Sequence, residues 1–288
     1  MPALIDLRRR IRSVKNTQQI TQAMKTVSTA KFRKAQRMLL EGRPYWHTFL
    51  DLLADVHSWT EGYLHPLLDE RSEEKIEGLV ITSDKGLAGA FSSNLLEKAL
   101  SFFEQKARSS EVKLVLVGKK AVSFFKDQPF TVERIYTDEV EKIAFEQMQE
   151  IAQFLIELYV FQRVDAVYVA YNEFKSILAP RITISKLLPL VSAKEEGEES
   201  VLIPDWEPEV VSILSLLLPL YVESQVYHYF RESSTAEHAA RMMAMDNATK
   251  NAEELIEDLT LVLNKVRQAS ITKELLEIMT AVEALAKK

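Results

Sequence analysis

The chain has 288 residues, of which 47% are hydrophobic and 27% charged, and its formal net charge is −6. This composition excludes collagen-like, disordered and disulfide-scaffold proteins. Cysteine is absent, which also excludes thiolate nucleophiles and cysteine–zinc sites. Glycine occurs only seven times, and neither the first 41 nor the last 91 residues contain one. Because glycine serves turns and helix ends, these two ends are predicted to form long helices.

The N-terminal stretch predicts a helix from about Ala3 to Leu40, with Gly42 and Pro44 as its stop. Residues 1–40 hold ten basic residues and one acid, a charge of +9. Such a helix faces an acidic partner (nucleic acid, lipid headgroups or an acidic protein loop) or is a solvated face. A polar segment interrupts its apolar stripe, whose predicted members are Leu4, Leu7, Ile11, Val14, Ile20, Met24 and Val27.

The middle of the chain alternates short apolar runs with helical segments, which predicts a mostly parallel α/β sheet. Strands are expected at 78–82, 113–117, 131–136 and 166–170, with 131–136 as an exposed edge. Helices are expected at 94–106, with Asn94 and Glu97 as a capping box, at 119–126, and from a cap at Asp138. The acidic stretch 191–209 predicts a surface loop.

The C-terminal stretch predicts a helix from about Leu220 to Leu285, which would be roughly 100 Å long. Its apolar residues repeat with heptad spacing and shift register near Ala269, so it is expected to protrude and to pair with the N-terminal helix as a coiled coil. The predicted seam consists of Met245, Ala248, Ala252, Leu255, Leu259, Val262, Val266 and Ala269. The expected division is an N-terminal helix (1–58), an α/β domain (74–190), an acidic loop (191–209) and a C-terminal helix (210–288).

The search for chemistry finds one suggestive turn, Ser83–Phe91 (SDKGLAGAF), placed between a strand and a helix where phosphate loops sit. It fits neither the dinucleotide fingerprint nor the P-loop, so it is either an unusual nucleotide site or a tight turn. The five histidines form no metal-ligand pattern, and no catalytic triad can be assembled. We therefore assign no catalytic, cofactor-binding or metal-binding residue.

Two sequence features bear on location. No apolar stretch follows the N-terminal charges, so no signal peptide is expected. The longest uncharged apolar run, at 210–222, has 13 residues, fewer than the roughly 17–25 that a membrane span needs. The chain is therefore predicted to be cytosolic or peripheral on a membrane.

Several segments together resemble the gamma subunit of the rotary ATP synthase, and the resemblance covers essentially the whole chain. They are IRSVKNTQQITQAMKTVSTAK (11–31), SDKGLAGAFSSN (83–94), ISKLLPL (184–190), YVESQVY (221–227), STAEHAARMMAMDNATKNA (234–252) and NKVRQASITKELLEI (264–278). The resemblance implies an antiparallel coiled coil of the terminal helices plus a central Rossmann-like α/β domain. It implies a rotor shaft without cofactor that turns inside a hexamer of alpha and beta subunits, the beta subunits carrying the catalytic sites.

The resemblance also implies partners and contact residues. The partners would be alpha, beta and epsilon subunits and a membrane c-ring. Location would be the cytoplasmic face of the bacterial cell membrane, with membrane contact through the ring only and no nucleic acid. The residues matching the region that catches the beta subunit are Met24, Lys25, Arg267, Gln268, Thr272 and Glu274. Coil packing is the other interpretation for Met24, and a basic coiled-coil nucleic-acid-binding or scaffold protein is the alternative for the whole chain.

Overall fold

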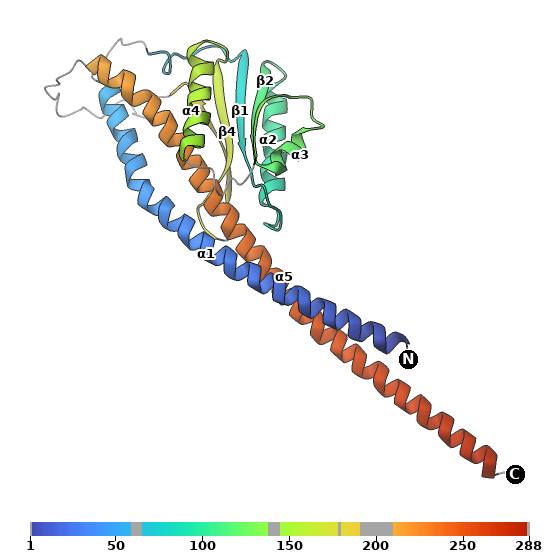
Figure 1. Cartoon of the computed structure of the whole chain (residues 1–288). Coiled ribbons are helices and arrows are strands. Elements are labelled where there is room, and N and C mark those ends of the chain that lie inside the picture. Colours follow the sequence, from blue (N-terminus) through green and yellow to red (C-terminus); the bar gives the residue numbers. More distant parts are fainter. Residues whose placement is uncertain (1, 59–64, 138–144, 178–179, 191–209, 287–288) are drawn as a thin grey trace. The chain divides into compact units, whose positions relative to one another are not determined.

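The computed structural model describes residues 2–58, 65–137, 145–177, 180–190 and 210–286. Two long helices bracket the chain, α1 (Pro2–Ser58) and α5 (Val210–Ala286) (Figure 1). The chain separates into two compact units, one formed by Thr29–Arg241 and the other by Met1–Ser28 together with Met242–Lys288. Each long helix therefore contributes to both units, a different partition from the expected domain division, which stays a prediction.

Both terminal helices run longer than the sequence analysis expected. Helix α1 continues through Gly42 and Pro44 to Ser58, so the predicted stop is wrong. Trp46 is buried and its ring packs at a tilt against that of His228 of α5, with ring centroids 4.1 Å apart. A Cβ at Gly42 would lie 2.7 Å from the Trp46 ring, so glycine makes room for this indole. Tertiary packing of Trp46 thus sustains a helix that the local glycine and proline signals would end.

The larger unit contains a five-stranded sheet in the order β3-β2-β1-β4-β5. The first four strands are parallel, and β5 runs antiparallel to β4, which confirms a mostly parallel α/β sheet. Strand β3 lies at one edge, as predicted, whereas β5 was not predicted. The strands are β1 (Lys75–Ile81), β2 (Glu111–Val117), β3 (Thr131–Tyr136), β4 (Ala166–Glu173) and β5 (Arg181–Leu188).

Helices cover both faces of this sheet. Helices α2 (Phe91–Lys106) and α3 (Lys119–Phe125) pack on one face, around Phe103 and Phe125. Helix α4 (Phe145–Val160) and the beginning of α5 pack on the other face, around Tyr159 and Phe230. Helix α2 begins three residues before the predicted capping box and has no side-chain cap at Ala90, so that box is wrong. The expected Asp138 cap and the loop 191–209 lie outside the described residues.

Within the ranges that the structure describes, no helix is long and apolar enough to cross a membrane.

Candidate functional site

The smaller unit is built from the first turns of α1 and the C-terminal part of α5, which pair in antiparallel order. The Thr249 hydroxyl donates a hydrogen bond to the Thr21 hydroxyl at 2.8 Å. The Lys25 ammonium lies 2.6 Å from the Asp246 carboxylate. Rising numbers on α1 thus face falling numbers on α5. This pairing is the coiled coil that the two glycine-free ends predicted.

The face of α1 that packs in the coil becomes polar halfway along. Ile20 and Val27, predicted in the apolar stripe, are 61% and 56% exposed, so that part of the stripe is wrong. Thr21 and Ser28 are buried in their place. Heptad spacing relates the buried and half-buried positions Leu4, Leu7, Ile11, Val14, Gln18, Thr21, Lys25 and Ser28, and Met24, beside Lys25, is half-buried as well.

The face of α5 agrees with the predicted seam at five of its eight positions, since Ala248 and Val266 are half-buried and three others are buried. Met245, Ala252 and Leu259 are buried, but Leu255 and Val262 are 38% and 44% exposed. The alternate inward positions are the half-buried Thr249, Ile256, Leu263 and Ser270, and the predicted Ala269 is exposed. Leu255–Ile256 and Val262–Leu263 are apolar neighbours, so heptad spacing alone could not choose between them. The packing against α1 decides, one residue later than predicted.

Polar contacts join the two helices of the coil at the level of Lys25 and Asp246, where the apolar seam ends. The Asp246 carboxylate binds Lys25 and, at 2.9 Å, Lys250 one turn further along α5. Hydrogen bonds from Lys25 first and Lys250 second lower the pKa of Asp246. Lys25, assigned to partner binding by resemblance, thus has a structural contact within the coil.

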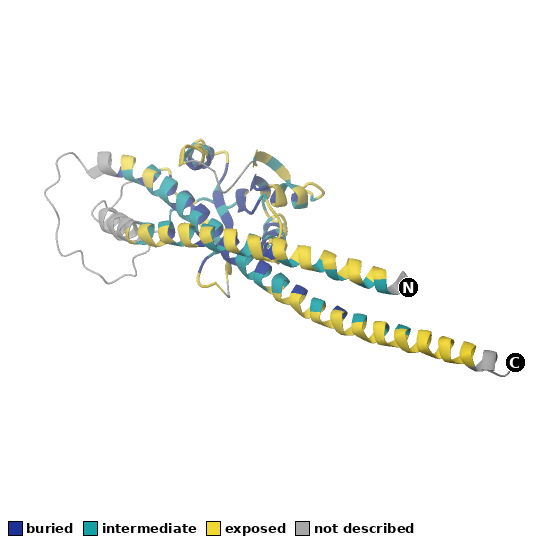
Figure 2. Ribbon diagram, turned by 60° about the horizontal axis from the view of Figure 1, so that its bottom comes forward, coloured by how far each residue is buried: buried dark blue, intermediate teal, exposed yellow. Residues whose placement is uncertain are grey.

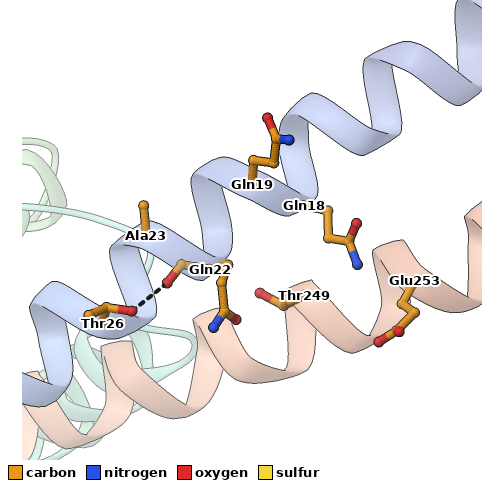
Figure 3. Close-up of a pocket in the computed structure, with 7 residues that line it drawn as sticks. All are labelled: Gln18, Gln19, Gln22, Ala23, Thr26, Thr249 and Glu253. Carbon is orange, nitrogen blue, oxygen red and sulfur yellow. Dashed lines mark hydrogen bonds between the residues drawn. The ribbon is translucent and has the colours of Figure 1, made fainter.

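An open groove of about 560 Å³ lies beside this polar layer (Figure 3). The groove exists because the short and polar side chains around it fill less of the space between the helices than leucine or isoleucine would. Its lining consists of Gln18, Gln19, Gln22, Ala23, Thr26, Thr249 and Glu253.

The predicted beta-contact residues form two separate groups. Met24 is half-buried and Lys25 lies beside Asp246, at one end of the smaller unit. The other four, Arg267, Gln268, Thr272 and Glu274, are exposed on α5. Arg267 follows Asp246 by about 21 residues, a rise of roughly 30 Å along the helix. The structure therefore does not bring the two groups into one site.

The tail of α5 carries large apolar side chains in the open, although the sequence predicted a second seam there (Figure 2). Counting from the Thr21–Thr249 contact, the beginning of α1 lies opposite residues near 267. The α5 tail beyond that point is unpaired with α1. Its apolar residues, Ile271, Leu275, Leu276, Ile278, Met279 and Val282, are 47–68% exposed.

In the larger unit, the turn Ser83–Phe91 follows the central strand β1 and precedes α2. The Ser83 hydroxyl lies 2.9 Å from that of Ser92, and the Asp84 carboxylate accepts a hydrogen bond from the Lys119 amide. The guanidinium of Arg241, on α5, donates to the carbonyl oxygens of Lys85 and Gly86, both at 3.3 Å. A cation bound by carbonyls is the opposite of the anion-binding amides that a phosphate needs. This geometry favours the tight-turn interpretation over a nucleotide site.

Among the residues described, no three metal-ligating side chains gather to hold an ion.

The fold defines a class: proteins in which a doubly wound sheet is inserted between two terminal helices that pair as an antiparallel coil. Comparison with known proteins identifies one family within this class. The ATP synthase family profile matches residues 3–285. The ATP synthase gamma chain of Pelotomaculum thermopropionicum is 44% identical over 285 residues, covering 99% of this chain and all of that one. The gamma chain of Desulforudis audaxviator is 43% identical with equal coverage.

Solved structures agree. A chain of the central stalk and c-ring structure of Tetrahymena thermophila mitochondrial ATP synthase superposes with a TM-score of 0.60 at 25% identity, covering 80% of this chain and 99% of that one. A chain of the Euglena gracilis mitochondrial ATP synthase reaches 0.69 at 22% identity, covering 99% and 95%, and supports the fold. The chain belongs to the ATP synthase gamma chain family.

Proposed function

We propose that this chain is the central rotor shaft of a proton-translocating ATP synthase. It would couple rotation of a membrane ring to the sequential conformational changes of catalytic beta subunits during ATP synthesis or hydrolysis. It carries no catalytic residue in this proposal. Family membership supports the role, and the nucleic-acid-binding alternative gains no support from these relatives.

The observation that carries the proposal is the unpaired tail of α5. Exposed apolar side chains line one side of this single helix, and water does not favour such a surface. Ile20 and Val27 add exposed apolar side chains on the paired part of the coil. A surface of this kind fits an apolar sleeve around the helix, which a hexamer of alpha and beta subunits would provide.

We assign the beta contacts to two levels along the shaft. Arg267, Gln268, Thr272 and Glu274 are exposed and suit direct hydrogen bonds to a beta subunit. Met24 and Lys25 would make the second contact, with Lys25 sharing its ammonium between a beta carboxylate and Asp246. The basic residues near the start of α1 would attract acidic loops of beta as these move.

The remaining partners follow from the same role. The sheet-bearing unit would contact the c-ring and the epsilon subunit. The chain would lie at the cytoplasmic face of the bacterial cell membrane and touch the membrane through the ring only.

Reconstitution tests the proposal. Vesicles carrying the membrane sector are combined with alpha, beta and epsilon subunits, with or without this chain, and receive ATP. With the chain present, we expect hydrolysis to acidify the vesicle interior. Without it, hydrolysis and acidification should be uncoupled. Equal acidification per ATP hydrolysed in both preparations would refute the role.

A further inference from the structure

The turn Ser83–Phe91 is the one motif that the proposed function leaves without a purpose, and the structure ties it to α5. Arg241 reaches it with two different nitrogens, Nε to the Gly86 oxygen and an Nη to the Lys85 oxygen. The same Nη lies 2.6 Å from the carboxylate of Glu237, one turn earlier on α5. Both side chains of this ion pair are more than nine-tenths buried.

The turn itself is anchored to several elements of the sheet. Asp84 accepts from the first amide of α3, and the Lys120 amide donates to the Ser83 oxygen. Thr82 accepts from the Ala121 amide and donates to the Val117 oxygen at the end of β2. On the β4 side, the Asn172 amide group donates to the Phe91 oxygen. A side chain that binds this turn is therefore connected, through the turn, to β1, β2, α3 and β4.

A buried ion pair is a weak source of stability, because removing two charges from water costs about as much as their attraction returns. What such a pair does provide is a contact that depends on the orientation of the two side chains. The hydrophobic effect itself has no directionality, so apolar packing orients a helix only through the shapes of its side chains. The planar guanidinium fork accepts only a narrow geometry. Arg241 therefore adds a directional contact that fixes the angular position of α5, beside the apolar packing around it.

Other polar contacts hold α5 in the same unit. Glu223 accepts a hydrogen bond from Gln149 of α4 at 3.0 Å, and Glu232 accepts one from the Phe174 amide at 2.7 Å. Arg241 comes last in the chain, immediately before Met242, where the helix enters the second compact unit.

We propose that Arg241 is a positioning residue whose contact with the turn Ser83–Phe91 passes torque between the sheet and α5. The torque rests on the proposed function, whereas the fixing of α5 is a property of the chain alone. Glu237 orients the guanidinium, and the torque is transmitted through its hydrogen bonds to the two carbonyl oxygens of the turn.

The test uses the full chain with Arg241→Met and Glu237→Leu combined, which removes both charges and leaves no buried ion alone. Arg241→Lys alone, which keeps the charge but loses the fork, is a second variant in case the first folds poorly. The matched control is Arg134→Gln with Glu150→Gln, since that Arg–Glu pair lies exposed in the same unit at 3.4 Å.

Two measurements distinguish the fixing of α5 by Arg241 from the transfer of torque through it. In the isolated chain, amide hydrogen exchange in residues 84–90 should accelerate about tenfold in the double variant, as expected for loss of one charge-assisted contact, and remain unchanged in the control. In reconstituted vesicles, the double variant should hydrolyse ATP at the control rate but acidify the interior less per ATP.

The outcomes are distinguishable. Unchanged exchange in both variants would show that Arg241 does not hold the turn. Faster exchange with unchanged acidification per ATP would show that the held turn carries no torque. Either result overturns the proposal. Failure of the proposed function itself would appear differently, as acidification that does not depend on the unmodified chain at all.

Discussion

Glu77 offers a sharp test of the electrostatics of the sheet. This carboxyl group lies on the central strand β1 and is fully buried. Burial first, and then the nearby charge of Glu133, raise its pKa from 4.5 to about 9, while Lys113 lowers it. Glu77→Gln removes the titration and preserves the shape of the side chain.

The sign follows from proton binding. Between pH 4.5 and about 9 the folded chain keeps a proton on Glu77 that the unfolded chain releases. The stability associated with this proton is full below pH 4.5 and is lost as the pH rises through the folded-state pKa. The slope is about 1.4 kcal/mol per pH unit, so the free energy of unfolding should fall by about 4 kcal/mol from about pH 5 to about pH 8.

Denaturant unfolding of the full chain at several pH values checks this. Other groups also titrate, including His65, whose pKa burial lowers, so the informative quantity is the difference between the unmodified chain and Glu77→Gln. That difference should favour the variant increasingly as the pH rises. The exposed Glu150→Gln is the control and should follow the unmodified chain. Parallel pH profiles for Glu77→Gln and the unmodified chain would refute the reasoning.

Two further predictions concern packing. Leu259→Asp places a charge in the coil and should lower stability by about 3 kcal/mol, whereas Leu255→Asp, one turn earlier at a position that is 38% exposed, should cost under about 1 kcal/mol. Thermal unfolding followed by circular dichroism measures both, and equal losses would contradict the register described here. Gly78→Ala would place a Cβ 2.5 Å from the Phe103 ring and 2.7 Å from Leu114, and should cost about 1–3 kcal/mol in denaturant titrations. Gly86→Ala meets no atom closer than 3.9 Å and should be nearly neutral; a comparable loss there would argue against steric crowding as the cause.

The sequence by itself determined the architecture of this protein. Glycine-free ends, heptad spacing after Met245 and alternating strands and helices were enough to predict two long terminal helices around an α/β sheet, and the motifs identified the family. Local signals succeeded because they depend on the chain's own periodicity. Strand β5 was not predicted, although Ile182 and Ile184 alternate with Thr183 and Ser185, and its antiparallel pairing with β4 forms only in the folded sheet.

Tertiary structure decided what local signals leave open. It carried α1 past Pro44, since the buried Trp46 packs against α5. It also chose the inner face of the coil, placing Thr21 inside and Ile20 outside, because the opposing helix offers Thr249 and Asp246 at that level. The Arg241 contact with the turn after β1 joins residues more than 150 positions apart. Such contacts depend on which surfaces the folded chain brings together, and no periodicity in the sequence encodes them.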